Sequence, residues 1–298
     1  MSAPASGKTA FVLAGGGSLG AVQVGMLKAL ARAGIVPDMI VGASVGAING
    51  AFFAGDPTPA GVERIERIWL GLSRSNVFPF PFIQGCLGLA GRSSHVSDPS
   101  RLRSILEPLL PCCKLEDCVV PCAVVATDLM DGSERVYREG PTMDLLLASA
   151  AIPAVFPPVL HEGRFLGDGG LSNNAPVSTA VSLGATKVIA LSTGFSCALT
   201  QPPHGAVATA LHALNLLINR RLVRDLEEMS GRVDMAVVPP LCPVEVTPFD
   251  FSTSADLIRR AEASTRLWLR QGGLSRRGIP DEFSPHTHGL PRKFVTAR

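Results

Sequence analysis

The hydrophobic pattern at the start of the chain predicts two short strands joined by a helix. Apolar runs at 10–14 and 39–41 have the length of buried strands, and 21–33 carries apolar residues at helical spacing. Two strands joined in this way form a right-handed parallel βαβ unit. Because ligands bind such units at the carboxyl ends of the strands, we expect the functional residues near 15–20 and 42–46.

The rest of the chain continues this alternation, which predicts an α/β protein with a mainly parallel sheet. Further strands are expected at 119–127, 134–138, 187–191 and 233–238, and helices at 61–70, 100–110, 142–151, 177–183, 206–229 and 254–270. We expect a flexible N-terminus at 1–9, one domain at 10–273 and a mobile tail at 274–298, with five basic and two acidic residues.

The composition restricts the binding partners and the cellular location that we expect for the protein. Hydrophobic residues make up 46% and charged residues 17% of the 298 residues, against a usual charged share of about 25%. A net charge of +2 provides no large positive field, so we expect no nucleic-acid partner. No apolar run reaches the roughly 18 to 20 residues of a membrane span, and the N-terminus has no signal-peptide core. These features predict a cytoplasmic protein.

One segment, 76–96, lacks a steady hydrophobic period. It interleaves phenylalanine and leucine with proline, glycine and serine. Two interpretations stay open: an irregular connection packed on the core, or a lid over an acyl chain that touches a membrane through 78–89. A surface of this kind gains about 25 cal/mol for each Å² of apolar area that it buries.

The seven cysteines predict reduced thiols, because their number is odd and their spacing forms no disulfide framework. Four of them cluster: Cys112, Cys113, Cys118 and Cys122. A zinc site is the alternative, but the spacing is not a paired Cys-x-x-Cys. We therefore expect buried thiols and no metal ion.

A Gly-x-Ser-x-Gly sequence follows the second strand, with Gly42, Ser44 and Gly46 as its fixed positions. At a sharp strand-to-helix turn the central serine adopts a strained conformation, and the flanking glycines remove side chains that would clash. Ser44 is therefore a candidate nucleophile. The alternative is a small-residue turn that merely packs a helix close to a strand.

The loop after the first strand has glycines at 15, 16, 17 and 20 and satisfies Gly-x-Gly-x-x-Gly. A dinucleotide site also needs an acidic residue at the end of the second strand, and here Ser44 takes that place. We therefore expect no nicotinamide cofactor. The other use of such a loop is an oxyanion hole, in which backbone N–H groups at a helix N-terminus receive developing negative charge.

A serine nucleophile needs a base, and Asp168 is the candidate. It lies between glycines, Gly167 and Gly169, with Gly170 following, so its carboxylate can reach a pocket with little obstruction. An Asp-Gly turn without function is the alternative. The histidines lie in loops, on a helix or in the tail, and none of them points to a Ser-His-Asp triad. A Ser44–Asp168 dyad needs no histidine, and His161 is the fallback base.

Three motifs in this order resemble the patatin-like phospholipase family over residues 11–191. They are Gly15 to Gly20, Gly42 to Gly46 and Asp168-Gly169-Gly170, with supporting similarity at 126–129, 148–153 and 174–176. The resemblance implies a three-layer α/β/α fold with Ser44 as nucleophile and Asp168 as base. It also implies an oxyanion hole at Gly16, Gly17 and Ser18. Leu19 stands where many members have Arg or Lys, which leaves a headgroup preference open.

By this resemblance the chain is expected to be a serine lipid acyl hydrolase of the phospholipase A or lysophospholipase type, without a cofactor. Its substrate would be a lipid or lysolipid, reached by peripheral contact with a membrane. Two alternatives stay open: an acyltransferase that uses the same acyl-enzyme, and a lipid-binding regulatory protein.

Overall fold

The protein is built on one mixed sheet of eight strands. The computed structural model describes residues 7–78, 97–199, 201, 203–284, 286 and 288. The strand order is β5-β6-β3-β2-β1-β7-β8, with β4 also paired to β3. The strands are β1 (Thr9–Leu13), β2 (Met39–Ala43), β3 (Cys122–Asp128), β4 (Glu134–Tyr137), β5 (Val159–His161), β6 (Arg164–Gly167), β7 (Lys187–Leu191) and β8 (Asp234–Val238).

Five strands, β3-β2-β1-β7-β8, are parallel, and β4, β5 and β6 add antiparallel pairs beyond β3. In the register of β1 with β2, Leu13 is opposite Gly42. The loops that follow these two strands therefore begin at the same edge of the sheet. The glycine loop and Ser44 lie at this edge.

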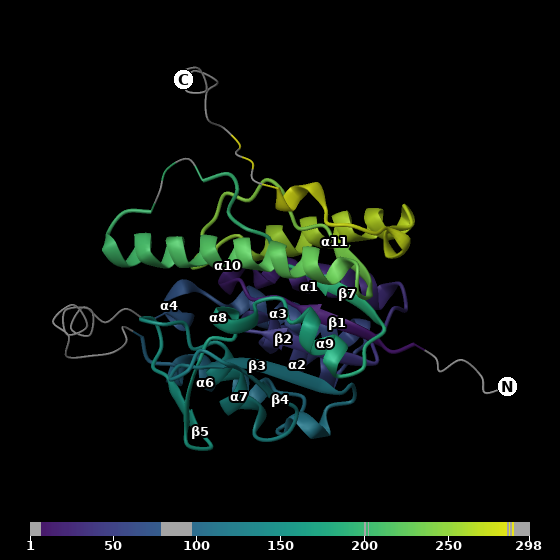
Figure 1. The fold of residues 1–298 in the computed structure, drawn as a ribbon. Coiled ribbons are helices and arrows are strands. Elements are labelled where there is room, and N and C mark those ends of the chain that lie inside the picture. The colour runs from purple at the N-terminus through teal and green to yellow at the C-terminus, as the bar shows by residue number, and fades with distance from the viewer. Residues whose placement is uncertain are drawn as a thin grey trace.

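Helices cover both faces of the sheet (Figure 1). They are α1 (Gly20–Arg32), α2 (Val45–Gly55), α3 (Pro59–Gly71), α4 (Arg74–Val77), α6 (Ser100–Leu106), α7 (Thr142–Ser149), α8 (Gly170–Asn173), α9 (Val177–Ser182), α10 (Ala206–Ser230) and α11 (Ser254–Arg270). Alternate residues of the buried strands enter two cores. Phe11 and Leu13 pack in the core with α1, α2, α3 and α11, and Ala10 and Val12 pack in the core with α9 and α10.

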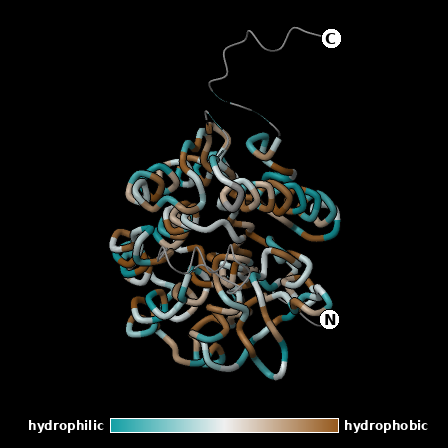
Figure 2. The backbone as a smooth tube through the Cα atoms, turned by 90° about the vertical axis from the view of Figure 1, so that its left-hand side faces the viewer, coloured by the Kyte–Doolittle hydropathy of each residue, from teal (hydrophilic) through white to brown (hydrophobic). Residues whose placement is uncertain are grey.

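These two cores confirm the predicted three-layer α/β/α fold. Figure 2 shows hydrophobic segments running through the interior, with helices that alternate between hydrophobic and hydrophilic turns. Phe11 stacks on Phe53 of α2 at a centroid distance of 6.1 Å, and both side chains are fully buried. This packing fixes the helix that follows Ser44 against the strand that precedes the glycine loop.

Local signals explain where several elements begin and end. Thr58 caps α3, because its Oγ1 accepts the Gly61 N–H at 3.1 Å and Pro59 is the first helical residue. The helix expected at 100–110 ends earlier, at Leu106, and continues as a 3₁₀ turn, Glu107–Leu109, around Pro108. Proline lacks the N–H that would continue the helix.

The segment after residue 273, expected to be mobile, is packed in its described part. It forms 3₁₀ turns at Gly273–Ser275 and Asp281–Phe283, and Phe283 is buried in the core beneath α10. Arg277 also forms an ion pair with Asp234 at 2.7 Å. Hydrophobic burial of Phe283 therefore holds this part of the chain to the sheet, which the polar composition did not reveal.

The expectation of reduced thiols is wrong for one pair, because Cys112 and Cys118 form a disulfide. A 3₁₀ turn, Leu115–Asp117, folds the chain back and brings the two Cα atoms to 5.5 Å. Cys113 is exposed, whereas Cys122 is buried in β3. Burial raises the pKa of the Cys122 thiol to about 12, so this thiol stays neutral.

The expected lid at 76–96 and the membrane contact through 78–89 lie largely outside the described residues. Phe78 is described, and it is buried against Phe156, Phe249 and Phe251 at centroid distances of 5.6, 5.2 and 6.0 Å. This residue therefore packs inward. Within the described ranges, no helix has the length and apolar character needed to cross a bilayer.

Candidate active site

Ser44 occupies the predicted strand-to-helix turn between β2 and α2. Its backbone has φ 54° and ψ −129°, a conformation that a residue with a side chain rarely adopts. A Cβ at position 46 would lie 2.2 Å from the Leu13 carbonyl oxygen, and one at position 42 would lie 2.5 Å from the Gly46 carbonyl oxygen. Both glycines are therefore required by close backbone approach around the serine.

The structure brings Ser44 and Asp168 together although 124 positions separate them. The Ser44 hydroxyl donates to Asp168 Oδ2 at 2.6 Å, and both residues are buried. The sheet produces this contact, because β3 lies beside β2 and pairs with β6 at Thr127 and Gly167. Thr127 also donates its hydroxyl to the Asp168 carbonyl oxygen at 2.7 Å, which fixes the backbone that carries the carboxylate.

Burial raises the pKa of Asp168 from 3.8 to about 6. Hydrogen bonds from the Ser44 hydroxyl and the Gly170 N–H, the latter at 2.8 Å, stabilise the carboxylate and oppose this shift. A carboxylate with this pKa accepts a proton far more readily near neutral pH than one at the ordinary value. The Asp168 carboxylate therefore has the location and the basicity of a general base.

Ser149, the last residue of α7, fixes both members of this pair. Its hydroxyl accepts the Ser44 N–H at 2.8 Å and donates to the Val125 carbonyl oxygen at 2.5 Å, and its own carbonyl accepts the Gly169 N–H at 3.0 Å. In the sequence, residues 148–153 showed only a similarity to the family. A buried serine at the end of an apolar helix was the available signal for a positioning role.

The glycine loop faces the same site, and its backbone donors are not equivalent. The Gly15 N–H bonds to Asn174, and the Ser18 N–H donates to the Pro248 carbonyl at 2.8 Å. Among the residues described, the amides of Gly16 and Gly17 have no acceptor. Of the three residues expected in an oxyanion hole, Ser18 therefore has its N–H bonded to Pro248, and the amides of Gly16 and Gly17 are the donors left for that proposed role.

A buried polar chain positions this loop from behind, and the sequence did not reveal it. The Trp69 indole donates to Asn49 Oδ1 at 2.9 Å, and Asn49 Nδ2 donates to Gln23 Oε1 at 2.9 Å. Gln23 then donates to the carbonyls of Ala14 and Leu191 at 2.7 and 3.0 Å. These bonds tie together the ends of β1 and β7, where the glycine loop begins.

Two cavities meet at Ser44. A cavity of about 630 Å³ is lined by Ser44, Asp168, the glycine loop and apolar residues of α10 such as Leu211, Leu214 and Ile218. A narrower, almost wholly apolar pocket of about 60 Å³ is also lined by Ser44. Its walls come mainly from α2, α3, α6 and the aromatic group around Phe78: Ile48, Phe52, Ile65, Ile68, Trp69, Leu72, Leu102, Leu106, Phe156 and Phe251. The serine therefore lies where an apolar channel joins a wider cleft.

No described histidine is hydrogen-bonded to Ser44 or Asp168. His161, the fallback base, lies at the edge strand β5 with its ring against Tyr137 at 5.1 Å. His204 and His212 line the wide cavity. His95 lies outside the described residues. The contacts of Ser44 in the described chain are those of a Ser–Asp pair, and they place no histidine beside it.

The fold and this site define a class of three-layer α/β/α proteins with a serine at a strand-to-helix elbow. Residues 11–181 match the family model described as "Patatin-like phospholipase". The chain belongs to this family, which confirms the predicted resemblance.

The curated relatives are much longer proteins. Patatin-like phospholipase domain-containing protein 7 of Rattus norvegicus is 32% identical over 187 residues, which cover 62% of this chain and 13% of that protein. Patatin-like phospholipase domain-containing protein 6 of Homo sapiens is 30% identical with the same coverage. Neuropathy target esterase sws of Drosophila melanogaster is 30% identical over 185 residues, 61% of this chain and 13% of that protein. The match thus spans about an eighth of these relatives.

Solved structures resemble the chain more distantly. VipD from Legionella pneumophila is similar with a TM-score of 0.48 and 15% identity, covering 90% of this chain and 67% of that one. Human GIVD cytosolic phospholipase A2, in complex with methyl gamma-linolenyl fluorophosphonate, has a TM-score of 0.46 and 13% identity, covering 90% and 59%.

Proposed function

We propose that this protein hydrolyses fatty-acyl esters of glycerolipids or lysolipids through an acyl-Ser44 intermediate. The observation that carries the proposal is the 2.6 Å hydrogen bond from the Ser44 hydroxyl to a buried carboxylate of raised pKa. Membership of the patatin-like phospholipase family and the curated relatives named as phospholipases and an esterase support the same reaction.

In the proposed first half-reaction, Ser44 Oγ attacks the ester carbonyl while Asp168 accepts the hydroxyl proton. Asp168 then gives this proton to the leaving alcohol as the tetrahedral intermediate collapses. In the second half-reaction Asp168 takes a proton from water, whose oxygen attacks the acyl-serine carbonyl. Asp168 then returns this proton to Ser44 Oγ as the ester bond breaks and the fatty acid is released. The N–H groups of Gly16 and Gly17 would stabilise the developing oxyanion, each by about 3 to 4 kcal/mol.

The walls of the two cavities support a lipid substrate. The narrow pocket beside Ser44 is apolar and fits a section of an acyl chain, whereas the wide cavity gives room for the rest of the lipid. Leu19, where many members of the family have a cation, is buried in the core with 1% of its surface exposed. We therefore infer that this position makes no contact with a phosphate headgroup. Of the expected membrane contact at 78–89, Phe78 is buried in the core, so the proposed contact with a membrane surface is restricted to 79–89, which lie outside the described residues.

A panel of lipid esters, combined with a fluorophosphonate probe, tests the proposed reaction. The wild-type protein should release fatty acid and become labelled at Ser44, and Ser44→Ala should abolish both signals while its circular dichroism spectrum is unchanged. Ser182→Ala, a change of the same size on α9 away from the cavity, is the matched control and should retain both. Full ester hydrolysis by Ser44→Ala would exclude the proposed nucleophile, and an unlabelled wild-type protein would indicate a lipid-binding role.

A further inference from the structure

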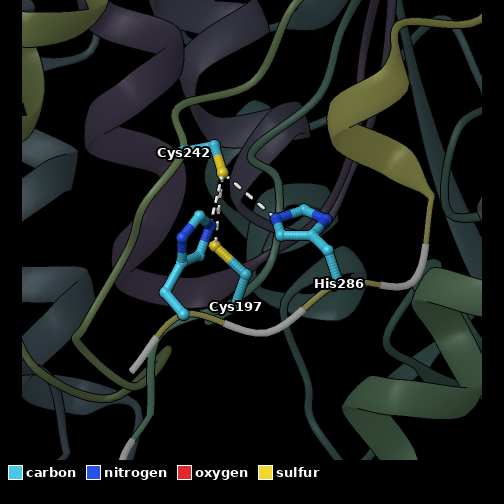
Figure 3. A group of neighbouring side chains, drawn as sticks. Cys197, Cys242 and His286 are labelled. Carbon is cyan, nitrogen blue, oxygen red and sulfur yellow. Dashed lines mark hydrogen bonds between the residues drawn. The ribbon is translucent and has the colours of Figure 1, made fainter. Parts of the chain in front are cut away.

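Two cysteines and two histidines from three distant parts of the chain meet at one point. Cys197 follows β7, Cys242 follows β8, and His286 and His288 follow the last 3₁₀ turn. Their two sulfurs and two imidazole nitrogens all lie within 4.8 Å of one another. Figure 3 shows the side chains of Cys197, Cys242 and His286 directed toward one another.

The separations are close to those of a tetrahedral metal site. The Cys197 and Cys242 sulfurs are 3.8 Å apart. Zinc–sulfur bonds of about 2.3 Å at the tetrahedral angle give the same sulfur–sulfur separation, about 3.8 Å. The Cys242 sulfur lies 3.1 and 2.9 Å from Nε2 of His286 and His288. In a tetrahedral zinc site, a ligand sulfur and a ligand nitrogen lie about 3.5 Å apart. His288 is exposed and His286 is only half-buried. Small rotations of their side chains would therefore bring the sulfur–nitrogen separations to the tetrahedral value.

The groups around the cluster orient its ligand atoms. His286 Nδ1 lies 2.7 Å from the Ser284 carbonyl oxygen, which can only accept a hydrogen bond, so Nδ1 carries the proton. This tautomer leaves the lone pair of Nε2 directed at the cluster, the arrangement in which metal-binding histidines are commonly held. The Cys197 sulfur accepts the Val244 N–H at 3.4 Å, which holds this sulfur in its position in the cluster.

We propose that Cys197, Cys242, His286 and His288 form a structural zinc site. Two sulfurs and two imidazole nitrogens are a ligand set that suits zinc. Each thiol loses its proton to solvent when Zn²⁺ binds, and both imidazoles bind in the neutral form. The complex of two thiolates, two neutral rings and Zn²⁺ has no net charge. Four protein ligands leave no open position, so the role is structural.

The zinc site would hold two loops that support the glycine loop. The hydroxyl of Ser196 donates to the Val246 carbonyl at 2.6 Å, which joins the loops after β7 and β8 next to the cysteines. One and two residues further on, the carbonyls of Thr247 and Pro248 accept the hydroxyl and the N–H of Ser18 at 3.1 and 2.8 Å. The metal would therefore fasten the C-terminal segment to the loop that positions the oxyanion donors.

The test uses the full chain, purified in the presence of a thiol reductant and without chelator. Elemental analysis should find about one zinc ion per chain. Replacement of the zinc by Co²⁺ should give the intense visible bands of tetrahedral cobalt and a sulfur-to-cobalt charge-transfer band. His288→Ala and Cys242→Ser should each weaken zinc affinity by more than about 100-fold, because even loss of an outer-shell partner costs 10- to 100-fold.

Two control variants carry the same kinds of substitution at residues outside the cluster. Cys113→Ser removes an exposed free thiol, and His161→Ala removes an imidazole at the sheet edge. Both should retain the full zinc content and the cobalt spectrum. His288→Ala keeps the test valid if Cys242→Ser fails to fold, because the side chain of His288 is exposed.

Three results would overturn the proposal. The first is a reduced, folded wild-type protein that takes up no zinc when the metal is added. The second is unchanged zinc affinity in His288→Ala. The third is a Cys197–Cys242 disulfide that persists in the reduced preparation and accounts for both thiols. If a variant loses its zinc but keeps the thermal midpoint of the wild type, the chain binds zinc at these residues, but the zinc has no structural role.

Discussion

Replacing Asp168 by asparagine should make the protein more stable while abolishing its proposed activity. The carboxyl group has a pKa of 3.8 in water and about 6 in the folded chain, where burial is the main cause of the increase. A difference of about two pKa units corresponds to about 3 kcal/mol of lost stability once the group is ionised in both states. An asparagine side chain is neutral at every pH and has no such cost.

The sign of the effect follows from the direction of the shift. Because the folded state binds this proton more tightly, stability is highest below about pH 4 and decreases as the pH rises through about 6. Asp168→Asn should therefore match the wild type at about pH 4 and exceed it by about 1 to 3 kcal/mol at about pH 8. The lower end allows for the hydrogen bonds to Ser44 and Gly170 being weaker with an amide.

The assay is urea unfolding of both proteins at several pH values, with ester hydrolysis measured on the same preparations. Asp128→Asn is the control of opposite sign. Asp128 is also buried, but a hydrogen bond from Arg164 at 2.8 Å holds the pKa of its carboxyl below the ordinary value. Asp128→Asn should therefore have a lower free energy of unfolding than the wild type at neutral pH, and this deficit should decrease in acid. An Asp168→Asn gain of equal size at about pH 4 and pH 8 would show that the raised pKa of Asp168 is not the source of the gain, because only a raised pKa makes the gain depend on pH.

Three further results follow from the same site. The value of kcat/KM should rise with pH and level off above about 6, because Asp168 must be ionised to act as a base; a flat profile between about pH 4 and 8 would contradict this role. Ser149→Ala should cost about 1 to 3 kcal/mol in urea unfolding and reduce kcat, because it leaves the buried amide of Ser44, the proposed nucleophile, without an acceptor. Gly16→Ala should lower kcat by about 100-fold or more, since the new Cβ would lie 2.1 Å from a threonine hydroxyl, whereas Gly71→Ala meets open space and should leave hydrolysis unchanged.

Much of the fold could be predicted from local signals. The apolar runs and helical spacing between 10 and 41 predicted β1, α1 and β2 to within two residues at each end. Buried parallel strands are continuous apolar runs, so they are easily recognised. The antiparallel hairpin of β5 and β6 was harder to define, because only two of its seven strand residues are buried and its pairing depends on the end of β3.

The hydrogen-bonded pair of Ser44 and Asp168 was easier to expect from the sequence than the residues that support it. Ser44 and Asp168 belong to glycine-containing motifs, whereas Ser149, Gln23 and Asn49 act through bonds to backbone groups far away in the sequence. Only the folded chain shows these partners. For the same reason the Ser18 amide was assigned to the oxyanion hole: its acceptor, Pro248, lies 230 positions further on. The cysteines and histidines of the proposed zinc site have no spacing that joins them in sequence.

The position of β7 sets a lower limit on any active fragment. The family match ends at residue 181, but β7 begins at Lys187 and pairs along the full length of β1. A chain cut at 181 would expose the backbone hydrogen-bonding groups on that side of β1, an edge that promotes aggregation. It would also lose the carbonyl of Leu191, which receives the Gln23 amide behind the glycine loop. A fragment made for crystallisation or for transplantation into a longer protein therefore has to extend at least through residue 248, where the Pro248 carbonyl still holds Ser18.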